Sequence, residues 1–287
     1  MLVASSPEPR LSMCRKLALA ATALALIGTS AWAGSKAAHD VAPAAPAASS
    51  ATAAQPATPR KATAQERVEI ERMDPLSRAA FWARAVDVND RDFDAGVKLA
   101  KALRELDRSE DAIAAAERVL VMDPNNLPAL LESARAHIAG GQGFYAIDPA
   151  QRAATLDPKD WRPVALLAVA LEQSQRDDEA LAAHQRALAL APSNPALLSN
   201  LGMYYAAHGD AAQAETLLRR AAAMPGAGIQ VRQNLALILG LQGRLPEAER
   251  LARQDLPPGV VDNNLAYLRA AQTPPQQRSW DSMRSGQ

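Results

Sequence analysis

The sequence predicts an all-α solenoid of about five helix-turn-helix repeats of 34 residues, with a capping helix at each end. The chain of 287 residues is 48% hydrophobic but only 4% aromatic, so its apolar residues are mostly Ala and Leu, which favour helix packing over β-sheet. The segment Val231–Leu256 has helical periodicity on both sides of Gly243. The same pattern returns upstream every 34 residues, so each unit is expected to bury its apolar face against its neighbour.

The repeat frame is set by columns of small residues. The five repeats span residues 93–126, 127–160, 161–194, 195–228 and 229–258, and places are counted from the first residue of each. The eighth place holds Ala100, Ala134, Ala168, Gly202 and Ala236, and the twentieth holds Ala112, Ala146, Ala180, Ala214 and Ala248. Small side chains there let the two helices of a unit approach closely. Glycines near the middle of a unit break it into two helices, and prolines after the second helix end it.

The segments that flank the repeats predict caps. Residues 64–92 form an N-terminal capping segment, in which Leu76–Val86 matches a second helix that lacks most of its partner. Residues 259–272 form a lone C-terminal capping helix. Residues 273–287 are a polar tail that contains Trp280, and both docking on the cap and contact with a partner are open for this side chain.

The first 33 residues have the features of a secretory signal peptide. Arg15 and Lys16 precede an apolar run, Leu17–Ile27, and Ala31-Trp32-Ala33 forms a cleavage site. The alternative is an uncleaved anchor, but this run is shorter than the roughly 20 residues that a spanning helix needs. The Ala/Pro-rich residues 34–63 predict a disordered linker. We therefore expect an exported, periplasmic protein without a transmembrane segment in its mature chain.

Composition and motifs argue against several classes of function. The formal net charge is zero, which argues against nucleic-acid binding. Cys14 is the single cysteine, which excludes a disulfide framework and a cysteine zinc cluster. No nucleophile–base set is visible, so we expect neither a catalytic site nor a cofactor. His137 and His184 fall in core columns and are expected to be buried structural residues rather than metal ligands.

Two short motifs suggest ligand sites but do not meet the requirements. Asp90, Asp92 and Asp94 alternate as in a calcium loop, yet the required Gly and Glu are absent, so they are interpreted as acidic residues at a helix N-terminus. The glycine-rich stretch "AGGQGF" joins two helices and lacks a following Lys, so it is interpreted as a widened inter-helix turn.

A 34-residue unit with these columns resembles the tetratricopeptide repeat (TPR), and the resemblance covers Phe93–Leu256. It implies a TPR solenoid whose first helices line a concave face, with Asn residues at the sixth place binding the backbone of an extended peptide. The expected peptide-binding groove comprises Lys101, Arg104, Arg135, Ser199, Asn200, Met203, Gln233, Asn234 and Leu237. Its N-terminal half is expected to be basic and to attract acidic residues. Binding through the convex face or through the tail is the alternative.

Three stretches resemble more narrowly the TadD-like TPR proteins of the tight-adherence (Tad/Flp) pilus assembly system. They are "DPLSRAAFWARAV" (Asp74–Val86), Val231–Pro258 and "NNLAYLR" (Asn263–Arg269). The resemblance implies a non-enzymatic periplasmic scaffold whose protein partners include the secretin or other pilus assembly components. Members of this family are usually lipoproteins, whereas this chain has no cysteine after its apolar run. A general cell-envelope assembly factor unrelated to pili is the alternative, and an enzyme or small-molecule binder is a third.

Overall fold

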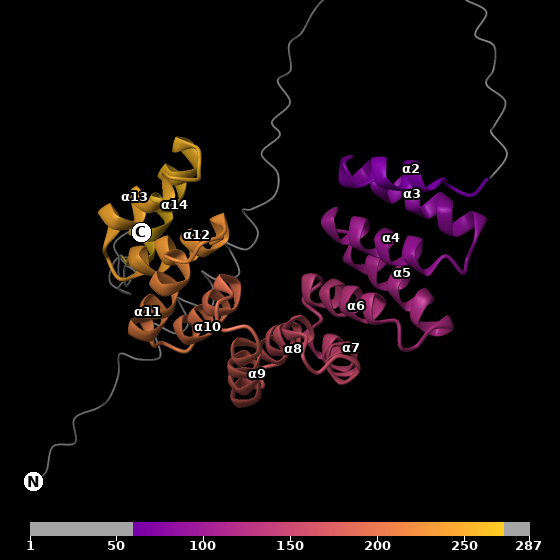
Figure 1. Ribbon diagram of the computed structural model, residues 1–287. Helices are drawn as coiled ribbons and strands as arrows, with labels where there is room; N and C mark the ends of the chain where they lie inside the picture. Colours follow the sequence, from indigo (N-terminus) through magenta and orange to yellow (C-terminus); the bar gives the residue numbers. More distant parts are fainter. Residues whose placement is uncertain (1–59, 273–287) are drawn as a thin grey trace, which may run out of the picture. The chain divides into compact units, whose positions relative to one another are not determined.

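The computed structural model describes residues 60–272, which form thirteen α-helices and no strand (Figure 1). This result confirms the predicted all-α fold class. The predicted signal peptide, almost all of the predicted linker and the polar tail with Trp280 lie outside the described residues. None of the helices within residues 60–272 is long and apolar enough to cross a membrane.

Ten of the helices form five helix-turn-helix pairs. The pairs are α4 (Phe93–Glu105) with α5 (Ser109–Met122), α6 (Leu127–Ala139) with α7 (Gly143–Leu156), α8 (Trp161–Gln173) with α9 (Asp177–Leu190), α10 (Pro195–Ala207) with α11 (Ala211–Ala222), and α12 (Ile229–Leu241) with α13 (Leu245–Ala252). The first helix of each pair begins 34 residues after the preceding one. The described residues divide into an N-terminal unit, 60–157, and a C-terminal unit, 158–272, and each is described by itself.

Short polar residues start the first helices. Asp92, Asn126, Asp160 and Asn194 precede α4, α6, α8 and α10, and each side-chain oxygen accepts a hydrogen bond from a backbone N–H in the first turn. Asp92 accepts from the amide of Ala95 at 3.0 Å. The interpretation of the acidic stretch as a helix N-terminus is therefore confirmed for Asp92.

The turn between the two helices of each pair has the same geometry throughout. Its middle residue is left-handed in every pair: φ is 59° at Asp107, 70° at Gly141, 58° at Gln175, 86° at Gly209 and 86° at Gly243. Three residues separate the helices in each case, including the "AGGQGF" turn. The expectation of a widened turn there was wrong, because Gly141 occupies the same left-handed position as its counterparts and Gly143 already belongs to α7.

The small-residue columns form the inner packing surface of each pair. The alanines of the eighth and twentieth places are at most 5% exposed. A methyl group on Gly202 would lie 3.0 Å from Cγ of Leu218 and 3.3 Å from the backbone oxygen of Ala214. The helices of this pair are thus too close for a larger side chain.

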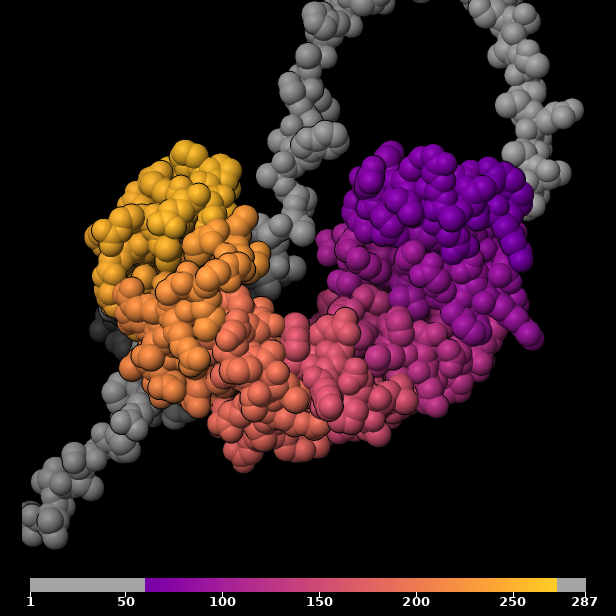
Figure 2. Space-filling view, viewed as in Figure 1, coloured from indigo at the N-terminus to yellow at the C-terminus, as the bar shows by residue number. Residues whose placement is uncertain are grey.

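Different residues cover the two ends of the stack. At the first end, α2 (Ala64–Ile70) and α3 (Pro75–Val88) lie against α4, and they are the indigo surface in Figure 2. Trp82 of α3 is fully buried, and the ammonium of Lys98 lies 4.7 Å from its ring centroid. At the other end, α14 (Pro258–Gln272) packs Val261, Leu265 and Leu268 against α12 and α13.

Candidate functional site

The first-helix face of the N-terminal unit is charged and internally paired. We use "first-helix face" for the residues at the second, fifth, sixth, ninth and twelfth places of the first helices. Glu132 of α6 is only 5% exposed and accepts from two arginines. Arg104 lies 3.1 Å from one carboxylate oxygen of Glu132, and Arg135 lies 2.5 Å from the other. Lys101 is exposed and makes no ion pair with any other residue in 60–272.

This pairing changes the interpretation of the predicted basic residues. Arg104 and Arg135 were expected to attract an acidic partner, but both already neutralise a buried carboxylate that lies between α4 and α6. Sequence reasoning missed Glu132. The available signal was an acidic residue at the sixth place, with arginines at the ninth place of its own repeat and the twelfth place of the preceding one.

On α10 and α12 of the C-terminal unit, the first-helix face carries amides and apolar groups. Asn200, Met203, Gln233 and Asn234 are half-buried on the neighbouring helices α10 and α12. The amide of Asn234 donates to Oγ of Ser199 at 3.0 Å and so links the two helices. Gln233 donates to Asp255 at 3.5 Å. Asn200 makes no side-chain hydrogen bond to another described residue, so its donor and acceptor are open.

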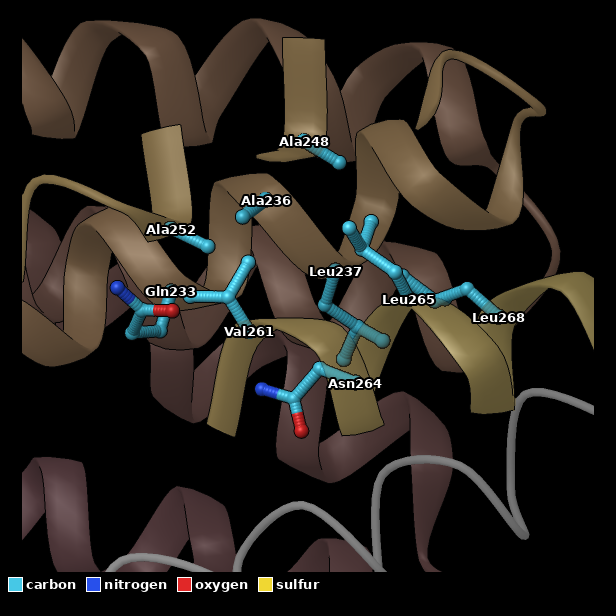
Figure 3. A pocket seen from close by; sticks show the side chains of 9 residues that line it. All are labelled: Gln233, Ala236, Leu237, Ala248, Ala252, Val261, Asn264, Leu265 and Leu268. Atoms are coloured by element: carbon cyan, nitrogen blue, oxygen red, sulfur yellow. The ribbon is translucent and has the colours of Figure 1, made fainter. Parts of the chain in front are cut away.

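Two predicted groove residues do not lie on an open surface. Ser199 is 2% exposed and Leu237 is 4% exposed. Leu237 and Gln233 instead line a cavity of about 20 Å³ between α12, α13 and α14 (Figure 3). The other lining side chains are Ala236, Ala248, Ala252, Val261, Asn264, Leu265 and Leu268. The cavity has room for about one water molecule and is far too small for an organic ligand.

An ion pair stabilises the last repeat. The guanidinium of Arg232 donates to both carboxylate oxygens of Asp255, at 2.7 and 2.6 Å, and to the carbonyl of Ala227 at 2.8 Å. These hydrogen bonds hold the pKa of Asp255 below its ordinary value. The two residues occupy the fourth and twenty-seventh places, where the first repeat has Gly96 and Val119 in apolar contact. Arg232 and Asp255 of the stretch Val231–Pro258 thus have a structural role in the last repeat, where they join α12 to the segment that follows α13.

Comparison with known families agrees with this architecture. Tetratricopeptide repeat models match residues 164–196, 196–224 and 229–256, all of them in the C-terminal unit. The chain contains tetratricopeptide repeats. A search of curated proteins finds no match.

Solved TPR structures share the fold. The thermophilic TPR protein TTC0263 from Thermus thermophilus is 23% identical, with a TM-score of 0.55, and the match covers 62% of this chain and 98% of that one. A tetratricopeptide repeat protein from Parabacteroides merdae ATCC 43184 is 13% identical, with a TM-score of 0.60 and coverage of 71% and 80%. TPR repeats imply a scaffold for protein–protein interaction.

The two histidines of this TPR protein that fall in core columns are packed inside it. His137 is 8% exposed and His184 is 2% exposed, which confirms that both are buried. Nε2 of His184 lies 2.8 Å from a carboxylate oxygen of Glu172, and Nδ1 of His137 lies 3.0 Å from the amide oxygen of Gln142. Within residues 60–272 no group of three or more His, Cys, Asp or Glu side chains is placed to hold a metal ion.

A wide hollow on the C-terminal unit offers no acid–base chemistry. It measures about 780 Å³ and lies between the loops that precede α10 and α12. Its lining is Ala191, Pro192, Ser193, Asn194, Pro195, Ala196, Pro225, Gly226, Gly228, Gln230 and Val231. None of these side chains is ionisable at neutral pH, so the hollow lacks the groups that general acid–base catalysis requires.

Proposed function

We propose that this TPR protein is a non-enzymatic scaffold of the bacterial cell envelope that binds protein partners during assembly of a Tad/Flp pilus. TPR architecture supports protein binding as its activity. The resemblance of Asp74–Val86, Val231–Pro258 and Asn263–Arg269 to TadD-like proteins supports the pilus system. The secretin and other pilus assembly components are the proposed partners.

The observation that carries the proposal is the open amide of Asn200 on the first-helix face of the C-terminal unit. An amide side chain donates and accepts at once, as an extended peptide backbone requires. Met203 lies one helical turn further along α10 and offers a flexible apolar contact. Gln233 lies on the neighbouring helix α12, so the peptide would meet both polar and apolar groups.

Export to the periplasm is part of the proposal. Its support is the apolar run Leu17–Ile27 followed by Ala31-Trp32-Ala33. The mature protein is then expected to begin at Gly34 and to appear in the periplasmic fraction when the cells are fractionated. N-terminal sequencing of the fractionated protein tests this, and a membrane-bound form that retains the apolar run Leu17–Ile27 would contradict it.

The pilus assignment is tested by deleting the gene in its source organism. Cells without it are expected to lose surface pili, and the full-length gene is expected to restore them. Asn200→Ala should restore pili poorly and should co-purify less secretin, while its thermal melting stays unchanged because Asn200 has no internal hydrogen bond. Normal piliation of the deletion strain would refute the pilus assignment and leave a general envelope scaffold as the function.

A further inference from the structure

Two aromatic side chains at the start of α7 are exposed. Phe144 is 70% exposed and Tyr145 is 65% exposed, in a chain that is only 4% aromatic. Their rings form an edge-to-face pair with centroids 5.6 Å apart. They lie in the first turn of α7, beside the α6–α7 turn (Figure 1).

The other repeats provide an internal control for this pair. The same eighteenth and nineteenth places hold Glu110 and Asp111, Asp178 and Glu179, Ala212 and Gln213, and Pro246 and Glu247. The other four pairs of helices form without an aromatic residue at these places, and acidic residues there interact favourably with the helix dipole. Phe144 and Tyr145 therefore expose apolar surface that the repeat fold does not need.

Carboxylates surround the aromatic pair. Asp148 follows Phe144 by four residues on the same side of α7 and is 75% exposed. Glu110 accepts from the amide of Gln142 at 2.6 Å, which places it at the α6–α7 turn. Glu117 is 58% exposed and lies 3.8 Å from Nε2 of His137, whose ring centroid is 5.9 Å from that of Tyr145.

The nearby cations are already paired. Arg108 pairs with Asp111 at 2.8 Å. Arg152 pairs with Asp148 at 3.3 Å and also donates to the carbonyl of Pro124. Asp111 and Asp148 are thus paired with these arginines, whereas Glu110 and Glu117 make no ion pair with an arginine or lysine of residues 60–272, which leaves an excess of negative charge among the named groups.

We propose that Phe144 and Tyr145, with Asp148, Glu110 and Glu117, form a second docking surface, the aromatic–acidic patch, for a partner protein segment that exposes Lys or Arg beside an apolar residue. A cation over an aromatic ring is attracted to its negative face, and nearby carboxylates add to that attraction. The apolar residue would cover ring surface that now faces solvent. The patch rests on the proposed scaffold role but differs in chemistry from the first-helix face that bears Asn200.

The test is a selection of short random peptides on the full-length protein, followed by affinity measurement. Selected peptides are expected to be rich in Lys or Arg next to an apolar residue. They should bind about tenfold more weakly to F144A/Y145Q, which removes both rings without adding charge and carries the residues of the fourth repeat at these places. Replacing the peptide's Lys with norleucine should weaken binding to a similar degree. The matched control A212S/Q213N makes two neutral changes at the same places of the fourth repeat and should bind normally.

Several outcomes would overturn the patch. One is equal binding of the selected peptides to wild type and F144A/Y145Q when both melt at the same temperature. A second is equal binding of the norleucine peptides. A third is that Phe144 and Tyr145 drive binding to phosphatidylglycerol vesicles, or dimerisation, instead of peptide binding. If the patch fails while Asn200→Ala still impairs piliation, the proposed function stands without it. If Asn200→Ala has no effect while the patch peptides bind as expected, the patch stands alone.

Discussion

The N-terminal and C-terminal units share one repeat frame but use different chemistry on their first-helix faces. In the N-terminal unit, the buried carboxylate of Glu132 binds Arg104 and Arg135. In the C-terminal unit, the corresponding link between neighbouring first helices is the neutral hydrogen bond from Asn234 to Ser199. The small-residue columns that hold the helices together are the same in both. The difference shows that the frame leaves the chemistry of this face free to vary.

The two arrangements leave different groups open to a partner. In the N-terminal unit, Arg104 and Arg135 form ion pairs with Glu132, and a partner would have to compete with Glu132 for them. The C-terminal unit keeps the amide of Asn200 open beside Met203. We therefore expect the C-terminal first-helix face to bind an extended backbone and the N-terminal unit to contribute through its aromatic–acidic patch.

Substitutions in the small-residue columns are expected to reduce the free energy of unfolding most. Ala214→Leu places a large side chain between α10 and α11, where the residue is fully buried, and overpacking is expected to cost about 1–3 kcal/mol. Ala180→Leu should behave similarly. Urea unfolding measures the loss, and Ala212→Leu on the exposed side of α11 is the control. Equal stability of Ala214→Leu and Ala212→Leu would show that the column does not set the helix spacing.

Removing the charge of Glu132 should have the next largest effect. Glu132→Gln keeps the shape but leaves Arg104 and Arg135 facing each other, and loss of the charged hydrogen bonds is expected to cost about 2 kcal/mol. Asp111→Asn, which breaks the exposed Arg108–Asp111 pair, should cost less than about 0.5 kcal/mol. Chemical denaturation of both variants provides the comparison. An unchanged midpoint for Glu132→Gln would mean that the buried pair contributes only specificity.

The two asparagines of the C-terminal unit should separate structure from binding. Asn234→Ala removes the donor to Ser199 and is expected to cost about 1 kcal/mol. Asn200→Ala removes no internal bond, so a change within about 0.5 kcal/mol is expected. Thermal melting of the two single variants decides the matter. A larger loss for Asn200 than for Asn234 would reverse the roles assigned to them.

The smallest effect is expected at the inter-helix turns. Gln175 adopts a left-handed backbone conformation that glycine accepts without steric cost, so Gln175→Gly should raise stability by about 0.5 kcal/mol. Asp107→Gly in the other unit should gain less, because Asp tolerates this conformation better than Gln. Differential scanning calorimetry resolves such shifts. If Gln175→Gly lowers stability instead, the extra conformational entropy that glycine loses on folding outweighs the relief of the left-handed backbone strain at this position.

The repeat frame could be predicted from sequence because its determinants are local and periodic. Within each unit, neighbouring helix pairs pack on one another, so one spacing of small residues implies the packing pattern of the unit. The left-handed turns at Asp107 and Gln175 were not predicted, because the signal used was glycine and the fold imposes the same geometry on other residues. Burial of His137 and His184 followed from their columns.

The candidate site was predictable only in part. Periodicity placed Asn200, Met203, Gln233 and Asn234 on one face of neighbouring helices, and the structure has them there. It did not reveal that Ser199 and Leu237 are buried, since the boundary between the first-helix face and the core depends on how close the helices are. The aromatic–acidic patch was visible in the sequence as two aromatics where other repeats have polar residues, but only the structure showed their exposure.

The sequence alone determined the all-α class, the 34-residue period and the positions of the small columns. Helix propensity and side-chain size are properties of single residues, and the order of residues along the chain shows their period directly. The tertiary structure decided which charges and amides are used internally. Arg104 with Glu132, Asn234 with Ser199, and Arg232 with Asp255 are 23 to 35 residues apart. Whether such groups bond depends on helix spacing and side-chain rotamers to within about an ångström, because hydrogen bonds weaken steeply outside a narrow range of distance and angle. That information exists only once the helices are packed.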